Sequence, residues 1–369
     1  MKIFFDCRYV RTDHHDGISR FSARLVEELA AITAETGEHT VTMLIHDPAQ
    51  LALLPAVPWK LISAPTSARE MIVAHQINAF GPDIVFSPMQ TMGSRGRRYP
   101  LVLTVHDLIY YRHPKPPTSL SWPVRLLWRL YHLAWWPQRL LLNGADAIVA
   151  VSNTTATLIA EHHLTRKPVY VVPNAADTAA VASGATSFRD PVTRTKSLIY
   201  MGSFMPYKNV ETLVRAMDLL PEYDLHLLSR VSEADKTRLQ AIAPTGRLIF
   251  HNGTSEEDYQ ATLRTATALV SASLDEGFGI PLVEAMALGT PVVVSDIEIF
   301  HEIGGAAARY VTPRDAAGFA SAIRTLEEDR SWSRASHASL TQAAAFSWPV
   351  SAKKLLDVLV EVADAQAKG

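Results

Sequence analysis

The segment from Ala268 to Val294 reads ALVSASLDEGFGIPLVEAMALGTPVVV and contains one complete unit of an alternating fold. It begins with a short apolar run, passes through a glycine-rich loop into an apolar helix, and ends in a second apolar run. A strand, a helix and another strand in this order are typical of parallel α/β proteins. The segment therefore predicts a parallel sheet covered by helices.

The same alternation extends over the rest of the chain. Strands are expected at Lys2–Phe5, Thr40–Ile45, Ile84–Ser87, Leu101–Val105, Ala147–Val151, Val169–Val172, Ser197–Met201, Asp224–Leu228, Arg247–Phe250, Ala268–Ser271 and Pro291–Val294. Helices are expected at Ile18–Thr33, Asn209–Leu219, Glu256–Ala266 and Asp315–Glu328. This order predicts an α/β protein with two doubly wound parallel sheets, joined near Asn174–Pro191. A ligand cleft is expected between them, at the carboxyl ends of the strands.

The composition is that of an ordinary soluble chain. Of 369 residues, 48% are hydrophobic and 20% are charged, and the net charge is −2. No apolar run reaches the ~20 residues that a membrane span requires, and the N-terminus does not resemble a signal peptide. A single cysteine, Cys7, excludes an internal disulfide and fits a reducing compartment. We expect a cytoplasmic protein without a nucleic-acid partner.

Positive charge is concentrated in the first half, where residues 1–170 hold 17 Lys and Arg against 13 Asp and Glu. This excess suits an anionic partner, although ordinary scatter explains it equally well. Ser121–Arg139 is rich in tryptophan, leucine and arginine, and at helical spacing it forms a basic, aromatic stripe. Such a stripe suits an anionic membrane surface. The alternative, which we favour, is a core-facing helix with a solvated basic edge. Arg95–Arg98 is a second basic cluster.

Two carboxylates, Glu276 and Glu284, stand eight residues apart on either side of the helix start near Pro281. Glycines between them let backbone N–H groups approach a ligand, and a helix N-terminus favours an anion. This arrangement suits a polyhydroxylated, phosphorylated ligand. Glu284 needs a hydroxyl or cationic partner inside its helix.

Two further segments follow predicted strands. Lys208 stands where the Gly202–Asn209 loop enters a helix, which suits neutralisation of a diphosphate, although a solvated surface lysine is the alternative. His106 follows Leu101–Val105 and can bond a sugar hydroxyl, although it can also merely bond its neighbour at the strand end.

The loop after the first strand offers weaker candidates. Gly17 opens the first helix and Arg20 can reach an anion, while Arg11, His14 and His15 are candidates for acceptor contacts. The two histidines lack metal-site spacing, and the sequence contains no D-x-D triplet. A dinucleotide fingerprint and a Walker motif are absent too. We therefore expect no metal and no cofactor.

Taken together, these segments resemble glycosyltransferase family 4, whose members are retaining enzymes of the GT-B fold. The resemblance extends over almost the whole chain and is carried by Val105–Asp107, Val151–Asn153, Val172–Asn174, Gly202–Asn209, His251–Glu257, Glu276–Gly289 and Phe346–Trp348. It implies an acceptor-binding domain over residues 1–175 and a donor-binding domain over 176–348. It also implies a final helix, 349–369, that crosses back to the first domain.

The resemblance implies a role for each matching residue. Glu276 would bind the donor hexose and steady the charge at its anomeric carbon, Lys208 would neutralise the leaving diphosphate, and His106 would contact the sugar. Glu284 would bind the ribose. The expected donor-binding set is Gly17, Gly202, Ser203, Lys208, Arg230, Phe278, Gly279, Ile280, Leu282 and Glu284.

The chain departs from the family pattern in two places. Relatives carry a diphosphate-binding arginine where this chain has Tyr207 or Ser203, and Arg230 or Arg20 is the candidate replacement. Many relatives also have glycines where this chain has Ser229-Arg230, close to the nucleotide base.

The resemblance implies a metal-independent hexosyltransferase that uses a nucleotide diphosphate sugar linked to GDP or UDP. We expect mannose from GDP-mannose, a glycan or lipid-linked acceptor, and a role in cell-surface polysaccharide or lipopolysaccharide synthesis, with peripheral contact to the inner face of the membrane. The alternatives are a non-catalytic nucleotide-sugar binder and a nucleotide-sugar epimerase.

Overall fold

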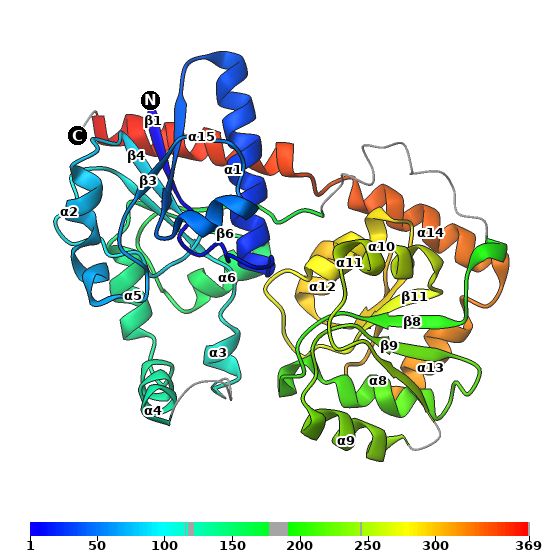
Figure 1. Ribbon diagram of the computed structural model, residues 1–369. Helices are drawn as coiled ribbons and strands as arrows, with labels where there is room; N and C mark the ends of the chain where they lie inside the picture. The colour runs from blue at the N-terminus through cyan, green and yellow to red at the C-terminus, as the bar shows by residue number, and fades with distance from the viewer. Residues whose placement is uncertain (115, 117–121, 177–190, 244–245, 368–369) are drawn as a thin grey trace. The chain divides into compact units, whose positions relative to one another are not determined.

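The computed structural model describes residues 1–114, 116, 122–176, 191–243 and 246–367, which form two compact units (Figure 1). Unit 1 is Met1–Asn174 together with Trp348–Gly369, and unit 2 is Ala175–Ser347. Each unit contains one parallel sheet with helices on both faces, so the predicted α/β fold with two doubly wound sheets is confirmed. The expected join at Asn174–Pro191 lies mostly outside the described residues.

The sheet of unit 1 has seven strands in the order β3-β2-β1-β4-β5-β6-β7. The strands are β1 (Lys2–Asp6), β2 (Thr40–Ile45), β3 (Trp59–Leu61), β4 (Ile84–Ser87), β5 (Leu101–Val105), β6 (Ala147–Ala150) and β7 (Val169–Val171). The helices are α1 (Gly17–Thr36), α2 (Val73–Asn78), α3 (Ile109–Arg112), α4 (Trp122–Tyr131), α5 (Trp136–Asn143), α6 (Asn153–Glu161) and α15 (Trp348–Ala367), with 3₁₀ turns η1 (Pro48–Leu53) and η2 (Ala68–Ile72).

The sheet of unit 2 has six strands in the order β10-β9-β8-β11-β12-β13. The strands are β8 (Ser197–Tyr200), β9 (Asp224–Leu227), β10 (Arg247–Phe250), β11 (Ala268–Ser271), β12 (Val292–Ser295) and β13 (Arg309–Val311). The helices are α8 (Val210–Met217), α9 (Glu233–Ile242), α10 (Glu256–Thr265), α11 (Ile280–Ala287), α12 (Glu298–Gly304), α13 (Ala316–Arg324) and α14 (Asp329–Ala343), with 3₁₀ turns η3 (Pro191–Thr193) and η4 (Pro206–Lys208).

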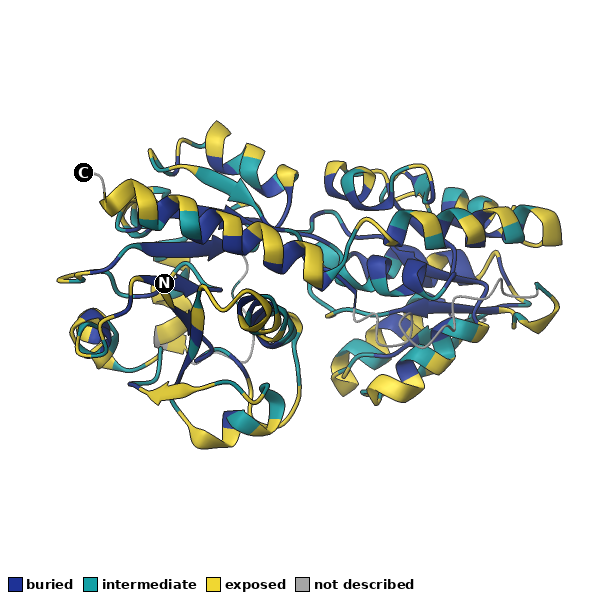
Figure 2. Ribbon diagram, turned by 90° about the horizontal axis from the view of Figure 1, so that it is seen from above, coloured by how far each residue is buried: buried dark blue, intermediate teal, exposed yellow. Residues whose placement is uncertain are grey.

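The central strands of both sheets are apolar throughout because helices cover both of their faces. Every residue of β4, β5 and β6 is buried, as is every residue of β8, β11 and β12, and Figure 2 shows these strands in dark blue. The sequence located all six of these buried runs to within one residue at each end.

Two short edge strands were not predicted. β3 (Trp59–Leu61) and β13 (Arg309–Val311) have three residues each, and all three residues of β3 are exposed. Both strands pair on one side only, with β2 and β12. Each contains a charged residue, Lys60 or Arg309, so neither has the apolar run that identifies a strand in a sequence.

The last helix, α15, packs along α1 in unit 1. Trp348 at its start is buried and meets the ring of Phe21 at 6.0 Å. Ser351 Oγ donates to the carbonyl of Pro173 at 2.7 Å, and Gln366 Nε2 donates to Asp146 at 3.1 Å. The helix is therefore attached to unit 1 along its whole length.

Candidate functional site

Lys208 and Glu276 form an ion pair at the carboxyl end of the unit 2 sheet. Lys208 ends the loop after β8, and Glu276 lies in the loop after β11, which is the neighbouring strand. Their Nζ and Oε1 atoms lie 2.5 Å apart, and the side chains are 16% and 13% exposed. Two residues that are 68 positions apart in sequence thus form one charged pair whose side chains remain partly exposed.

The two loops are tied together by Asn209. This residue has φ = 50°, in the left-handed region that asparagine tolerates better than most residues. Its side-chain amide donates to the carbonyls of Ala272 at 2.9 Å and Pro313 at 2.6 Å. The backbone N–H of Leu274 donates to the carbonyl of Tyr207 at 2.7 Å. Lys208 is therefore attached to a loop that is fixed against the loop of Glu276.

A serine also orients the Glu276 carboxylate. Ser273 Oγ donates to Oε1 of Glu276 at 2.8 Å and lies 3.2 Å from the hydroxyl of Ser271. Burial, followed by the negative charge of Glu276, raises the pKa of Tyr200 well above its usual value. The Tyr200 hydroxyl therefore stays protonated, and it donates to the carbonyl of Ser203 at 2.6 Å.

The glycine loop between the two carboxylates requires its glycine at 279. Gly279 has φ = 95° and caps α11. A Cβ there would lie 3.1 Å from the Phe300 ring. Phe278 is buried and meets Phe346 edge-on at 5.6 Å. Packing of Phe278 thus fixes the loop, and the backbone N–H groups at 278–280 are presented at the start of α11, where Leu282 is buried in the first turn.

Glu284 lies inside α11 and has a hydroxyl partner in the protein itself. Tyr259, from α10, donates to its Oε2 at 2.9 Å. Both residues line a small hollow together with Glu256 and Gln260. The sequence indicated that Glu284 needs such a partner, but nothing in it identified Tyr259, because the contact joins two helices.

The loop after β9 lies beside the start of the loop after β8. Ser229 Oγ accepts from the backbone N–H of Gly202 at 3.0 Å. Ser203 and Arg230 are exposed. The aliphatic part of Arg230 covers Gly253, where a Cβ would lie 3.3 Å from Cγ. Within the described part of the chain, Arg230 forms no ion pair, so its guanidinium is available to a ligand.

In unit 1, most polar side chains of the loop that leads into α1 form hydrogen bonds or ion pairs with each other or with the start of α1. Asp16 caps α1 by accepting from the N–H of Ser19 at 2.9 Å, and its other oxygen lies 2.5 Å from Arg11 Nε. His15 Nδ1 lies 2.8 Å from Ser19 Oγ, and His14 pairs with its neighbour in the chain. Gly17 is the exposed first residue of α1, and Arg20 is partly buried one turn later. The structure thus gathers these candidates on one loop of unit 1, whereas Lys208, Glu276, Glu284 and Arg230 belong to unit 2.

His106 lies at the carboxyl end of β5 with its ring against α1. The ring meets Phe21 edge-on at 5.1 Å, and Nε2 lies 2.7 Å from the carbonyl oxygen of Pro88. Burial lowers the pKa of His106, although the Pro88 hydrogen bond opposes this effect. The ring is therefore neutral near pH 7. Because a carbonyl only accepts, Nε2 carries the proton and Nδ1 is an acceptor.

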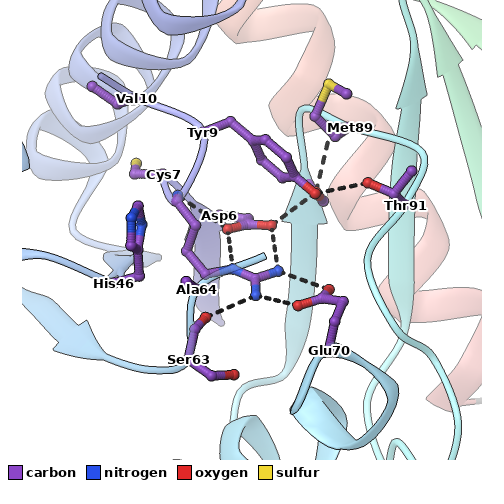
Figure 3. A network of polar contacts seen from close by, with 12 residues as sticks. Asp6, Cys7, Tyr9, Val10, His46, Ser63, Ala64, Glu70, Met89 and Thr91 are labelled. Carbon is purple, nitrogen blue, oxygen red and sulfur yellow. Dashed lines mark hydrogen bonds and ion pairs between the residues drawn. The ribbon is translucent and has the colours of Figure 1, made fainter. Parts of the chain in front are cut away.

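A buried ionic network in unit 1 was not anticipated from the sequence (Figure 3). Arg8 is 1% exposed, and its Nε donates to Asp6, which is 0% exposed, at 2.8 Å. Its NH1 atom donates to Glu70 at 2.6 Å and to the carbonyl of Ser63 at 3.1 Å. Burial alone would lower the pKa of Arg8, but Asp6 and Glu70 outweigh that effect and raise it. The only sequence signal was two opposite charges, Asp6 and Arg8, at the end of an apolar strand.

The basic, aromatic segment Ser121–Arg139 was expected to form a single helix, but the structure divides it into two. The chain turns at residues 132–135, between α4 and α5, and Ser121 lies outside the described residues. Two of the segment's tryptophans pack against α3, where Trp135 stacks on Tyr111 at 4.0 Å and Trp128 meets Tyr110 edge-on at 5.0 Å. The large exposed apolar side chains of this region are Trp122, Val124, Leu126, Leu127, Leu130, Leu133, Trp136 and Leu140.

The expectation of a core-facing helix with a basic edge is therefore wrong for α4. Leu127 is 69% exposed and Leu130 is 56% exposed, and Arg125 and Arg129 are exposed beside them. α4 extends away from the sheet of unit 1 (Figure 1), which leaves its leucines without a core to cover them. In the described residues, no helix has both the length and the hydropathy that a membrane crossing requires. Nor do three or more His, Cys, Asp or Glu side chains of that part of the chain form a group able to hold a metal ion.

Two known sequence families match this chain. The family described as "Glycosyltransferase Family 4" matches residues 15–180, and the family described as "Glycosyl transferases group 1" matches residues 188–345. Solved structures of similar fold include sucrose-phosphate synthase from Thermosynechococcus elongatus, with a TM-score of 0.71, 20% identity and 99% of both chains covered. Another is Anabaena HepE in complex with UDP and glucose, with a TM-score of 0.69, 18% identity, and 98% of this chain and 100% of that one covered.

Curated relatives match over shorter stretches. The O-antigen chain mannosyltransferase RfbU of Salmonella typhimurium is 33% identical over 132 residues, which is 35% of this chain and 37% of the relative. The MMP alpha-(1->4)-mannosyltransferase of Mycolicibacterium hassiacum is 28% identical over 234 residues, covering 59% of this chain and 54% of the relative. The O-antigen chain mannosyltransferase B of Escherichia coli is 31% identical over 159 residues, covering 41% and 42%. The matched part thus spans between about a third and a half of these relatives.

Proposed function

Because this chain belongs to the glycosyltransferases, joining a family 4 domain to a group 1 domain, we propose that it transfers a hexose from a nucleotide diphosphate sugar to a glycan or lipid-linked acceptor. The observation that carries the proposal is the Lys208–Glu276 pair at the end of two adjacent strands. A cation and a carboxylate held this close suit the two charges that glycosyl transfer develops.

In the proposed reaction, the bond between the anomeric carbon and the diphosphate oxygen breaks. Positive charge develops on the sugar and negative charge on the leaving diphosphate. Lys208 would neutralise the diphosphate and Glu276 would steady the sugar, with the N–H groups at 278–280 as further donors. Fixed charges aimed at such positions supply several kcal/mol of barrier reduction. Retention of the anomeric configuration follows from the resemblance to retaining enzymes.

The remaining donor contacts complete this proposal. Glu284 would exchange its Tyr259 hydroxyl for the ribose hydroxyls, and Arg230 would supply the second cation for the diphosphate. His106 would accept a hydrogen bond from a sugar hydroxyl through Nδ1. Since Lys208 and Arg230 provide positive charge, transfer would proceed without a metal ion. Arg11, His14, His15 and Arg20 are proposed for the acceptor side.

Mannose from GDP-mannose is the proposed donor, and cell-surface polysaccharide or lipopolysaccharide synthesis in the cytoplasm is the proposed role. The support is that the matched O-antigen chain relatives are mannosyltransferases. The likeness to HepE, at 18% identity, supports the fold alone. UDP-sugars belong in the test because the resemblance to family 4 leaves both GDP and UDP open.

The test is a donor panel of GDP-mannose, UDP-glucose, UDP-galactose and UDP-N-acetylglucosamine, offered with lipid-linked and free oligosaccharides in the presence of EDTA. We expect GDP-mannose to give product with retained configuration by NMR of the new linkage. Calorimetric binding of a donor without transfer or hydrolysis under any condition would instead identify a non-catalytic binder. Activity restored only by a divalent ion would overturn the metal-free mechanism.

The exposed face of α4 supports peripheral contact with an anionic membrane, on whose surface a lipid-linked acceptor would be presented. Its leucines are exposed, and arginines 125 and 129 flank them. Leucines that enter the interface gain about 1.5–3 kcal/mol each, and the arginines attract anionic headgroups.

Leu126→Glu and Leu130→Glu are each expected to weaken binding to phosphatidylglycerol liposomes at least about tenfold, measured by sedimentation. Each variant loses one leucine that the membrane would bury and adds one negative charge. Raising the salt concentration should weaken wild-type binding as well. The matched control is Leu219→Glu, at an exposed leucine of unit 2, which should leave binding unchanged. Equal loss in all three variants, or no liposome binding by the wild type, contradicts the proposal.

A further inference from the structure

Asp6, Arg8 and Glu70 form a network that we call the ion triad, and burying its charges in a protein interior costs free energy. Two of its side chains are fully buried and the third, Glu70, is 15% exposed. Removal of charges from water costs several kcal/mol per ion, and well-packed apolar residues usually stabilise as much or more. Leucines in the same positions would stabilise unit 1 about as well, so stability alone does not account for the ion triad. Its hydrogen bonds, however, also hold a neighbouring loop.

Those hydrogen bonds converge on residues 87–93, which comprise the last residue of β4 and the loop after it and are called the loop from here on. Asp6 Oδ2 accepts from Ser87 Oγ at 3.0 Å, and Glu70 Oε1 accepts from the N–H of Gly93 at 3.0 Å. Figure 3 shows a third attachment, in which Tyr9 and Thr91 are joined through hydroxyls 2.7 Å apart. The loop is thus tied at its start, near its middle and at its end to the ion triad or to the residue next to it.

At Gly93 the attachment leaves no room for a side chain. A Cβ there would lie 2.0 Å from the carbonyl oxygen of Glu70. The loop therefore lies directly against the backbone that carries Glu70, and its path has little freedom.

The same loop determines the hydrogen bonding of His106. Ser87 Oγ, which donates to Asp6, accepts from the N–H of Met89 at 3.3 Å. These two bonds hold the residues on either side of Pro88, whose carbonyl oxygen lies 2.7 Å from His106 Nε2. In the described residues no hydrogen bond reaches Nδ1. Nδ1, which carries no proton, is therefore the ring nitrogen that can accept a hydrogen bond from a ligand.

We propose that the ion triad is a positioning device for His106: it holds residues 87–93 so that the Pro88 carbonyl keeps the proton on Nε2 and Nδ1 is presented as an acceptor to a ligand hydroxyl. The role of Nδ1 toward a sugar hydroxyl rests on the proposed function. The positioning of the ring does not, because the tautomer exists in the protein without any donor. Asp6, Arg8, Glu70 and Ser87 act through His106 and touch no ligand.

The test uses Ser87→Ala, which removes the attachment nearest to Pro88, the hydrogen bond to Asp6, while the charges of the ion triad stay paired and Gly93 stays bonded to Glu70. Thr104 still donates to the carbonyl of Ser87 at 2.9 Å, so β4 keeps its place beside β5. The tautomer is read from ¹⁵N-histidine NMR of the full-length protein without ligand, with His106→Gln to assign the signal. In the wild type we expect two widely separated nitrogen resonances, with the proton on Nε2. In Ser87→Ala they should move toward each other as the second tautomer becomes populated.

Ser87→Thr keeps the hydroxyl and should restore the wild-type spectrum. The control Thr33→Val deletes a buried hydroxyl at the other end of α1 and should leave the spectrum unchanged. A wild-type ring protonated on Nδ1, or an Ser87→Ala spectrum identical to the wild type, would overturn the proposal. With an active donor, Ser87→Ala should lower kcat/KM about fivefold, as for one lost hydrogen bond. If no donor supports transfer, the proposed function is contradicted, but the positioning of His106 is still tested by the NMR result.

Discussion

Replacement of Glu276 by glutamine is expected to lower the rate of glycosyl transfer about 1,000-fold, which is the loss typical of one preorganised electrostatic group. Glutamine keeps the shape of the side chain and can still accept from Ser273 Oγ, which lies 2.8 Å from the carboxylate. What disappears is the negative charge that the proposed reaction requires beside the anomeric carbon. Steady-state kinetics with saturating donor would measure the change as a fall in kcat.

The same substitution should strengthen the binding of the nucleoside diphosphate. In the protein without donor, Lys208 is already paired with Glu276 at 2.5 Å, so an incoming diphosphate must displace the carboxylate. Glutamine competes more weakly, and a charged hydrogen bond is worth about 1.5–3 kcal/mol. We expect GDP or UDP to bind about tenfold more tightly to Glu276→Gln by calorimetry.

The control for both effects is Glu298→Gln, an exposed carboxylate at the start of α12 in the same unit. It should change neither kcat nor nucleotide affinity. If Glu276→Gln keeps its full kcat, or binds nucleoside diphosphates less tightly than the wild type, then Glu276 does not have the role assigned to it.

Replacement of Lys208 by methionine is expected to weaken nucleoside diphosphate binding about 100-fold and to lower kcat/KM about 1,000-fold. Two causes act together. The cation proposed to neutralise the diphosphate is lost, and the carboxylate of Glu276, only 13% exposed, is left without this partner and would repel the anion. Lys196→Met, an exposed lysine of unit 2 with 57% of its side chain accessible, is the control.

The double variant Lys208→Met/Glu276→Gln separates these two causes. It should bind nucleoside diphosphates more tightly than Lys208→Met alone, because the repelling carboxylate has been neutralised. Coupling of this kind is expected for residues in direct contact. Additive losses would show that the lysine and the glutamate act at separate places.

The sheets were predictable because most of their strands are short apolar runs that alternate with helical stretches along the sequence. β2, β4, β5, β10 and β11 have the bounds expected from the sequence; β12 is displaced by one residue at both ends, and the other predicted strands differ by one residue at one end. Edge strands β3 and β13 were missed because a charged residue, Lys60 or Arg309, interrupts each three-residue strand, whereas the equally short edge strand β7 reads Val-Tyr-Val and was predicted. The break between α4 and α5 was missed because the apolar spacing continues through it, while the aromatic side chains that terminate α4 pack against Tyr110 and Tyr111.

The candidate site was predictable only where its residues follow strands. Lys208 and Glu276 could each be identified as strand-end residues, and the adjacency of β8 and β11 brings them together. The contacts Tyr259–Glu284 and Arg8–Glu70 join elements that no local pattern relates. Such contacts depend on helix packing and on loop paths, which a sequence encodes only through the whole fold.

The attachment of α15 to α1 has a consequence for the order in which the chain is assembled. Of the described elements α15 is synthesised last, after the whole of unit 2, yet Phe21 and the apolar face of α1 need it as a cover. Domains of nascent chains generally fold as units, with the N-terminal one first. Here unit 1 must wait, with part of α1 uncovered, until the ribosome has released α15. Chaperone dependence during synthesis is therefore expected to centre on α1.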